Sequence, residues 1–378
     1  MIKNIRTYKL LFLFIFFIKN IGLAQVDSLS IEQVKRTTSN YKSFVTVNDK
    51  IFAITDSGKV VIWDLNKLDT VHFTNKDTSI RYTAISKDRH NQVFIGTNKG
   101  NIYKVDPTTI AHSLFLHDKY FIHSICFNSK NEMFLIVPFA VYKPSNKKYW
   151  RKFENHARGI VARKKVLGLF WKKTDNFLTM PQFAYLDNTD RWWMCSSYGE
   201  FGGEAQIFDT KNEKVYNNKF DSISPGLFFP KSVFNDQLGN VYITSGLQHF
   251  SDFGEIYKIA TDGTVTKIFE SKDFRDTTKQ KGLSDGIFVG PGAYNQNDNY
   301  IYFATAQGFY KAVLPTTGKI KNLTLLFNPT LSWEQERLAI GVGMAIKEIK
   351  FTANNKLIFL TSNDGFGIYT DKKLIMLK

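Results

Sequence analysis

Cysteine, proline and long apolar runs are all scarce in this chain of 378 residues. Only nine prolines are present, and no stretch rich in Pro and Ser marks a linker between domains. Neither His-x-His nor H-E-x-x-H occurs, which argues against the common zinc motifs. Helical periodicity is also scarce beyond the N-terminus, whereas runs of four to eight β-branched and aromatic residues bounded by Gly, Asn and Asp are frequent. These runs predict an all-β protein.

The two cysteines, Cys126 and Cys195, would suffice for one disulfide in an oxidising compartment. Both lie inside apolar, strand-like runs, where an unpaired Cys behaves as a small core residue. We therefore favour two buried thiols over a disulfide.

The N-terminus has the order of a secretory signal peptide. Three basic residues precede nine apolar residues at 10–18, and the small residues Gly22 and Ala24 precede a cut before Gln25. A membrane-spanning helix needs roughly 20 apolar residues, so the apolar run is too short to be an anchor. The sequence predicts a cleaved signal peptide over residues 1–24 and a mature protein in the periplasm or the medium.

Positive charge is in excess and mostly local. The chain has a net charge of +16, and its first 24 residues hold four basic and no acidic residues, which leaves +12 on the mature protein. Residues 143–173, here called the basic segment, contain eleven basic residues and one acid, Glu154. Aromatic residues are interleaved with these cations, among them Tyr149, Trp150, Phe153, Phe170 and Trp171.

Cations mixed with aromatic rings suit a polyanion through charge attraction and stacking. Outside the cytoplasm the candidates are acidic polysaccharide, lipopolysaccharide or an anionic membrane surface, and nucleic acid is disfavoured. The candidate binding residues of the basic segment are Arg151, Arg163, Lys164, Lys165 and Trp171. The alternative is a structural insertion whose aromatic rings pack on the domain under the Lys stems.

One two-strand phrase returns through the mature chain, as an internal repeat. It is an apolar run, a Gly-containing turn and a short strand that closes on an aromatic residue, as in YIYFATAQGFYKAV at 300–313 and LIFLTSNDGFGIYTD at 357–371. Seven such phrases recur every 40 to 60 residues, anchored at Ile51, Val93, Met133, Trp192, Val241, Ile301 and Leu357.

That period is the length of a four-stranded blade, which buries its two apolar faces only by stacking with neighbours until a ring closes. The sequence predicts one β-propeller domain over residues 25–378, with seven blades and with six or eight as alternatives. A two-sheet sandwich would not explain the repeat. An insertion is expected at about 143–180. Residues 28–37 and the C-terminal strand from Lys373 are both candidates for the outer strand that closes the ring.

A family resemblance supports this architecture. VIWD at 61–64 resembles the closing strand of a WD40 blade, and FIGT followed by GNIY and Asp within 94–106 resembles blades of regulator-type and quinoprotein-like sensor propellers. The resemblance covers most of residues 40–378 and implies the β-propeller fold. Trp-Asp occurs once and the Gly-His that begins a WD40 blade is absent, so the resemblance implies no functional residue.

In a blade, the loop between strands two and three emerges on the same face of the disc as the connection to the next blade. The long segments of this chain fall in these two classes, whereas the remaining turns are short. Long loops on a rigid scaffold carry function, so we expect a ligand site on this face, with capping of the channel as the alternative role. Its candidate binding residues are Tyr198, Phe201, His249, Asp252, Asp285, Trp333 and Glu334.

No catalytic, metal or cofactor motif stands in a fitting context. GLSDG at 282–286 spells G-x-S-x-G, but the strand before it and the helix after it that a nucleophile elbow requires are not predicted there. His112, His117 and His123 are five and six residues apart, which places no pair on one side of a short turn.

Two functions fit these observations. The first is a monomeric, exported binding or scaffold propeller that recognises a protein or an anionic glycan through its long-loop face or its basic segment. The second is an enzyme acting on an extracellular glycan, which requires two carboxylates about 5–10 Å apart near the axis. A channel lined by lysines would count against the enzyme, and the lack of a catalytic motif favours the first hypothesis.

Overall fold

The computed structural model describes residues 29–73, 77–153, 162–166, 170–174, 178–199, 202–216, 228–248, 252–271, 287–306, 308–329, 346–370 and 372–378. For 162–166, 170–174 and residue 248, the backbone alone is described. Within these residues the chain forms strands and one short 3-10 helix, Pro144–Asn146. No helix in this part of the chain is long and apolar enough to cross a membrane.

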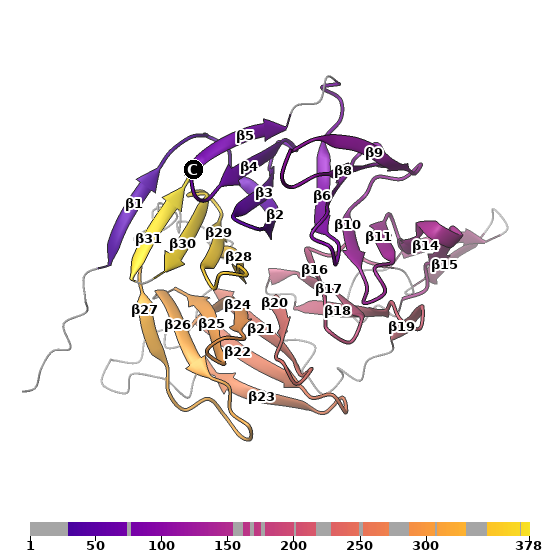
Figure 1. Ribbon diagram of the computed structural model, residues 1–378. Coiled ribbons are helices and arrows are strands. Elements are labelled where there is room, and N and C mark those ends of the chain that lie inside the picture. The colour runs from indigo at the N-terminus through magenta and orange to yellow at the C-terminus, as the bar shows by residue number, and fades with distance from the viewer. Residues whose placement is uncertain are drawn as a thin grey trace, which may run out of the picture.

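The strands form seven blades arranged in a ring around a central axis, which confirms the predicted seven-bladed β-propeller (Figure 1). Each blade is an antiparallel sheet of four strands in chain order, with the first strand nearest the axis and the fourth at the rim. The first three blades are blade 1, with β2 (Tyr41–Val47), β3 (Lys50–Thr55), β4 (Val60–Asp64) and β5 (Asp69–Phe73); blade 2, with β6 (Tyr82–Lys87), β7 (Val93–Thr97), β8 (Asn101–Val105) and β9 (His112–His117); and blade 3, with β10 (Ser124–Phe127), β11 (Met133–Val137), β12 (Ala140–Lys143) and β13 (Lys148–Trp150).

An additional two-stranded hairpin, β14 (Ala162–Val166) and β15 (Phe170–Thr174), lies in the connection from blade 3 to blade 4. It falls within the insertion predicted from the basic segment. The next two blades are blade 4, with β16 (Phe183–Leu186), β17 (Arg191–Ser197), β18 (Gly203–Asp209) and β19 (Lys214–Tyr216); and blade 5, with β20 (Pro230–Asn235), β21 (Val241–Gln248), β22 (Asp252–Ile259) and β23 (Val265–Glu270).

The last blade contains strands from both ends of the described chain. β1 pairs in parallel with β31 as a fifth, outermost strand, so both candidate closing strands are used. The Lys378 N–H donates to Val34 O (2.9 Å), and the Thr37 N–H donates to Lys378 O (3.0 Å). The remaining strands are β24 (Val289–Asn295), β25 (Tyr300–Thr305), β26 (Gly308–Val313) and β27 (Thr324–Phe327) in blade 6, and β28 (Ile346–Phe351), β29 (Leu357–Thr361), β30 (Phe366–Thr370) and β31 (Lys373–Leu377) with β1 (Ser30–Val34) in blade 7.

The apolar residues of the repeat form seven separate clusters, one between each pair of neighbouring blades. The second strands read as continuous apolar runs because their side chains alternate between the two faces of a blade and both faces are covered. Cys126 and Cys195 are buried and unpaired, on opposite sides of blade 4: Cys126 in the cluster toward blade 3 and Cys195 in the cluster toward blade 5. The preference for two buried thiols is confirmed.

The hairpins between first and second strands share a turn that holds one rim of the ring. In blades 2 to 5 an Asp or Asn side chain, at positions 88, 128, 187 and 236, accepts hydrogen bonds from the backbone N–H groups two and four residues later. The residue three positions on has a positive φ and is Asn91, Asn131, Asp190 or Gly239. These residue types accept the left-handed region at low cost.

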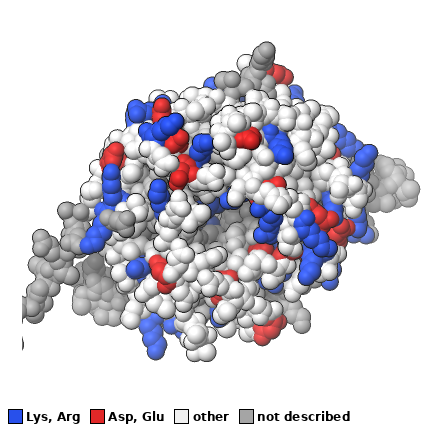
Figure 2. All heavy atoms as spheres, in the orientation of Figure 1, with Lys and Arg blue, Asp and Glu red and all other residues white. Residues whose placement is uncertain are grey.

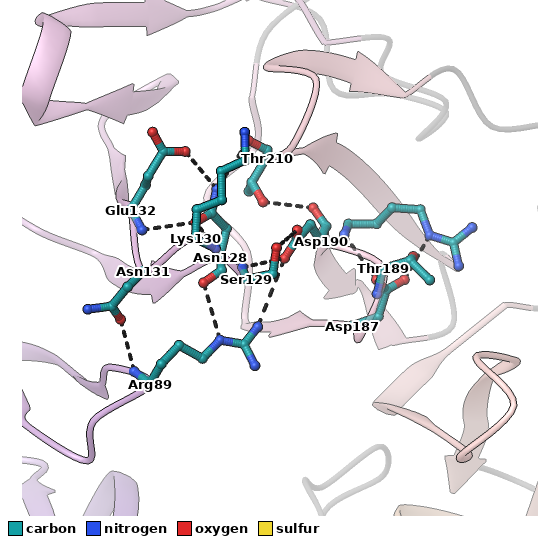
Figure 3. Close-up of polar contacts among 11 residues, drawn as sticks. Arg89, Asn128, Ser129, Lys130, Asn131, Glu132, Asp187, Thr189, Asp190 and Thr210 are labelled. Atoms are coloured by element: carbon teal, nitrogen blue, oxygen red, sulfur yellow. Dashed lines mark hydrogen bonds and ion pairs between the residues drawn. The ribbon is translucent and has the colours of Figure 1, made fainter.

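Side chains of these turns also join one blade to the next (Figure 3). The Ser129 backbone N–H of blade 3 donates to Asp190 Oδ1 of blade 4 (2.7 Å), and the Arg89 backbone N–H of blade 2 donates to Asn131 Oδ1 of blade 3 (2.9 Å). The Arg89 guanidinium reaches both Asn128 O and Asp190. The turns therefore act as polar staples across the blade interfaces.

Asp187 is the most enclosed acid of this network and is 1% exposed. Its Oδ2 accepts hydrogen bonds from Trp193 Nε1 and Arg191 Nε, both at 2.8 Å. Removing one member of a buried charged pair leaves the other unsatisfied, which costs about 3–5 kcal/mol. We expect Asp187→Ala to lower the free energy of unfolding by that amount in guanidinium titrations.

The matched control is Lys211→Ala, because Lys211 is exposed in a turn of the same blade. Its effect on the free energy of unfolding is expected within about 0.5 kcal/mol. An Asp187→Ala protein as stable as this control would contradict the structural role of Asp187.

Candidate functional site

The two faces of the ring differ as the sequence predicted. The short-turn face holds the hairpins between strands one and two and between strands three and four, and these turns are described almost completely. The long-loop face holds the hairpins between strands two and three and the blade connections. Five predicted site residues of this face lie outside the described residues: Phe201, His249, Asp285, Trp333 and Glu334. Arg163, Lys164, Lys165 and Trp171 lie in β14 and β15, whose side chains are not described.

The three predicted site residues with described side chains belong to different parts of the ring. Tyr198 follows β17, and its hydroxyl donates to Oε1 of buried Glu204 (2.7 Å); burial first, and then Glu204, raise the pKa of Tyr198. Asp252 begins β22 in blade 5 and is partly exposed. Arg151 follows blade 3, with its guanidinium 5.2 Å from the centre of the Tyr149 ring. The structure does not unite them in one cluster.

The basic segment begins inside the fold. Lys143, its first cation, is 6% exposed in β12 and contacts Glu132 Oε1 (2.6 Å) and Glu213 Oε1 (2.8 Å). Lys148 of β13 also pairs with Glu213, at 3.2 Å. These two lysines therefore join blade 3 to blade 4 instead of facing a ligand.

A different set of residues stands at the axis. Every first strand begins at the long-loop face, and in four blades the register of this strand skips its second residue, at a β-bulge. The skipped residues are Lys42 in β2, Thr83 in β6, Lys231 in β20 and Lys347 in β28. In β24 the register skips Gly290 and Pro291.

Blades 3 and 4 have the same feature one residue before the assigned strand. His123 N–H donates to Ile136 O (2.8 Å), although Ser124 is the residue paired with Ile136. Gln182 N–H donates to Cys195 O (2.9 Å), although Phe183 is paired with Cys195. The bulge is thus equivalent on all seven blades, and its residues in chain order are Lys42, Thr83, His123, Gln182, Lys231, Gly290 with Pro291, and Lys347.

A bulge re-aims a side chain next to a functional site. The charge of Lys42 on blade 1 acts on His123 on blade 3, although blade 2 lies between them. Such an interaction requires both side chains to face the common axis. We name Lys42, His123, Lys231 and Lys347 the channel-mouth set.

The members of this set differ in their partners. The Lys347 ammonium donates to Tyr41 O (2.8 Å) and lies 3.7 Å from Asp56 Oδ1. Neither the Lys42 nor the Lys231 ammonium has a hydrogen bond or ion pair with a described residue. Burial lowers the pKa of Lys231 to about 8. Burial, and then the charge of Lys42, lower the pKa of His123 to about 4, so its imidazole is neutral at pH 7.

Two more lysines lie nearer the short-turn face of the channel. Lys87 Nζ donates to Thr46 O (3.0 Å), and Lys350 Nζ donates to Phe44 O (2.8 Å). Burial, and then the Lys350 charge, lower the pKa of Lys87. Figure 2 shows a hollow at the centre of the ring with Lys and Arg atoms along its rim.

Acidic residues are nearly absent from the channel walls that the structure describes. Glu348 is the one carboxylate in the seven first strands, and its Oε1 is 2.7 Å from Lys350 Nζ. Cations facing a common axis can bind an anion by charge-assisted hydrogen bonds. These strands do not supply the two carboxylates that glycoside hydrolysis requires.

The three histidines of the sequence analysis serve separate roles. His112 lies 4.0 Å, centre to centre, from the Phe73 ring, and His117 Nδ1 contacts Asn101 Oδ1 (2.7 Å). Both belong to the rim strand β9, whereas His123 belongs to the channel mouth. In the described part of the chain, no group of three or more His, Cys, Asp or Glu residues is placed to hold a metal ion.

The channel-mouth set was not among the predicted site residues. A signal exists in the sequence: Lys follows an apolar residue at the start of the first strand in Tyr41-Lys42-Ser43, Pro230-Lys231-Ser232 and Ile346-Lys347-Glu348. Recognising it requires the first strands to be aligned as well as the second strands.

No family model matches the chain, and no curated protein matches it. Solved structures match over most of its length. Hydrazine synthase of Kuenenia stuttgartiensis has a TM-score of 0.56 and 8% identity, over 89% of this chain and 97% of that chain. YCF48 bound to D1 peptide has a TM-score of 0.55 and 10% identity, over 89% and 93%. The Cps50 (Swd1) β-propeller domain of Myceliophteria thermophila has a TM-score of 0.51 and 10% identity, over 88% and 98%. At these identities the likeness shows the fold alone.

Proposed function

We propose that this chain is an exported, non-catalytic β-propeller that binds an anionic ligand on its long-loop face, over the mouth of the channel. The channel-mouth set carries this proposal. Lys231 is a partly buried cation without a partner among the described residues. Burying a charge without a partner costs free energy, and a bound anion would offset that cost.

A polyanionic glycan is the ligand class that we favour. Repeated charge on such a chain allows simultaneous contact with the channel mouth and with the basic segment, whose cations beyond Lys148 surround aromatic residues. Solved neighbours include a propeller domain of WD40 type and one bound to a peptide, which is compatible with binding or scaffolding but does not choose the ligand.

The enzyme hypothesis has less support from the described channel. An oxocarbenium-forming hydrolase places two carboxyl groups on either side of the glycosidic bond. The first strands supply lysines at the equivalent positions, and Glu348 is held by Lys350. Binding without chemistry therefore agrees better with the charge of this channel.

Binding to a heparin resin tests the proposal. We expect the wild type to be retained and to elute as salt rises, because exposed charges are screened over about 10 Å at 0.1 M. The variant Lys42→Gln/Lys231→Gln/Lys347→Gln should bind heparin roughly tenfold more weakly, since each exposed ion pair contributes a fraction of a kcal/mol. Affinity is measured by titration at fixed salt.

The control removes the same charge from the short-turn face, at the exposed residues Lys67, Lys130 and Lys211. Equal affinity of the two triple variants would contradict the channel mouth as the binding site. Loss of binding in Arg163→Ala/Lys164→Ala/Lys165→Ala alone would assign recognition to the basic segment and away from the axis.

Export is tested separately by the N-terminus of the processed protein. Expressed in full in a bacterial host, the chain should be recovered outside the cytoplasm beginning at Gln25. Phe14→Arg interrupts the apolar run and should leave the precursor unprocessed, whereas Asn4→Arg extends the positive region and should not. Recovery of full-length protein with Met1 from every fraction would contradict export.

A further inference from the structure

We infer that the channel mouth takes a compact, doubly negative group end-on, such as the phosphate monoester or sulfate ester at the end of a glycan. The inference rests on the proposed function and names the part of the ligand that enters the axis. It follows from which bulge residues carry charge, which are already occupied, and how the charges balance.

The seven bulge positions are equivalent on first strands that surround one axis, so their side chains meet at one level. Side chains that converge on an axis favour a small group inserted along it. A long polyanion lying flat would instead spread its charges over the loops around the mouth.

Several of the other bulge residues are committed to the fold. Thr83 Oγ1 donates to Ile122 O, and the Gln182 amide bonds the backbone of Ser197 through Nε2 (2.7 Å) and Oε1 (3.2 Å). Blade 6 contributes Gly290 and Pro291, which add no long side chain between Lys231 of blade 5 and Lys347 of blade 7. The cations of blades 1, 5 and 7 are therefore the groups left to contact a ligand.

The charge balance fits a dianion. Asp56 lies 3.7 Å from Lys347 and compensates this cation in part. Lys42 and Lys231 are not compensated by any described residue. His123 is neutral at pH 7 because its pKa is held at about 4, so it adds hydrogen-bonding capacity without charge. Two free positive charges match a group of charge −2.

The Lys231 pKa predicts how this binding responds to pH. The elements that pack against β20 are β16, β17, β18, β21 and β24. Their charged residues are Arg191, Glu204 and Asp209, and their other titratable residues are Tyr185, Cys195, Tyr242 and Tyr294. None of these contributes to the Lys231 shift, whose cause is burial alone. Lys42, Lys347 and His123 are the titratable groups that share the axis.

Lys231 is charged below its pKa of about 8 and loses its charge as the pH rises through that value. A phosphate monoester is doubly charged only above its second pKa of about 6. Methyl phosphate should therefore bind most tightly between about pH 6 and 8. Sulfate stays doubly charged throughout, so its affinity should fall on the alkaline side alone.

Calorimetric titrations of the wild type and single variants with methyl phosphate and sulfate test this inference. At pH 7, Lys231→Gln and Lys42→Gln should each bind about tenfold more weakly, and Lys211→Gln should bind as the wild type does. Lys231→Arg keeps its charge at high pH, so it should retain affinity and remove the alkaline fall. Sulfate affinity that is constant from pH 7 to 9 in the wild type, or equal in Lys231→Gln and Lys211→Gln, would overturn the inference.

Competition separates this inference from the proposed function. If a chain end enters the mouth, saturating methyl phosphate should displace a heparin oligosaccharide from the wild type. Oligosaccharide binding that methyl phosphate does not disturb would overturn the end-on inference and leave polyanion binding intact. Binding of methyl phosphate without any binding of the oligosaccharide would support the dianion site and contradict the proposed function.

Discussion

The covering of two apolar faces on every blade is the constraint from which the rest of this structure follows. A single blade presents buried side chains on both sides of its sheet, and only a closed ring gives each side a neighbour. The seven apolar clusters are the result, one for each interface. The final interface needs strands from both ends of the described chain, so β1 lies beside β31 and Lys378 bonds to Val34. The polar staples at Asp190 and Asn131 then fix one rim of the same ring.

Closing the ring also creates the channel and its chemistry. The inner edge of each first strand has no partner strand, and unsatisfied backbone groups are costly where water is excluded. Lysines of neighbouring blades answer part of this demand on β2, where Tyr41, Phe44 and Thr46 carbonyls accept from Lys347, Lys350 and Lys87. The bulges bring further cations to the same axis. Lys42 and Lys231 are the ones that the fold leaves without a described partner.

The sequence was sufficient for the architecture because the second and third strands of each blade repeat strongly. The recurring phrase predicted seven blades, one domain face with long loops, buried thiols and the two candidate closing strands. The channel-mouth set escaped this approach because a bulge is a property of strand register, and the first strands are short and variable in sequence. His123 was judged only as a metal ligand, yet its role depends on Lys42 from a blade that is not adjacent. The Asp or Asn that begins the first turn, at 88, 128, 187 and 236, was a readable signal that would have located the first strands.

The central claim is that the uncompensated cations at the axis form an anion site, and diffraction from crystals soaked in tungstate tests it most directly. Tungstate is a compact dianion with a strong anomalous signal. We predict an anomalous peak on the ring axis at the long-loop face, about 3 Å from the Lys42 and Lys231 ammonium nitrogens. Peaks confined to the basic segment, with none at the axis, would contradict the account.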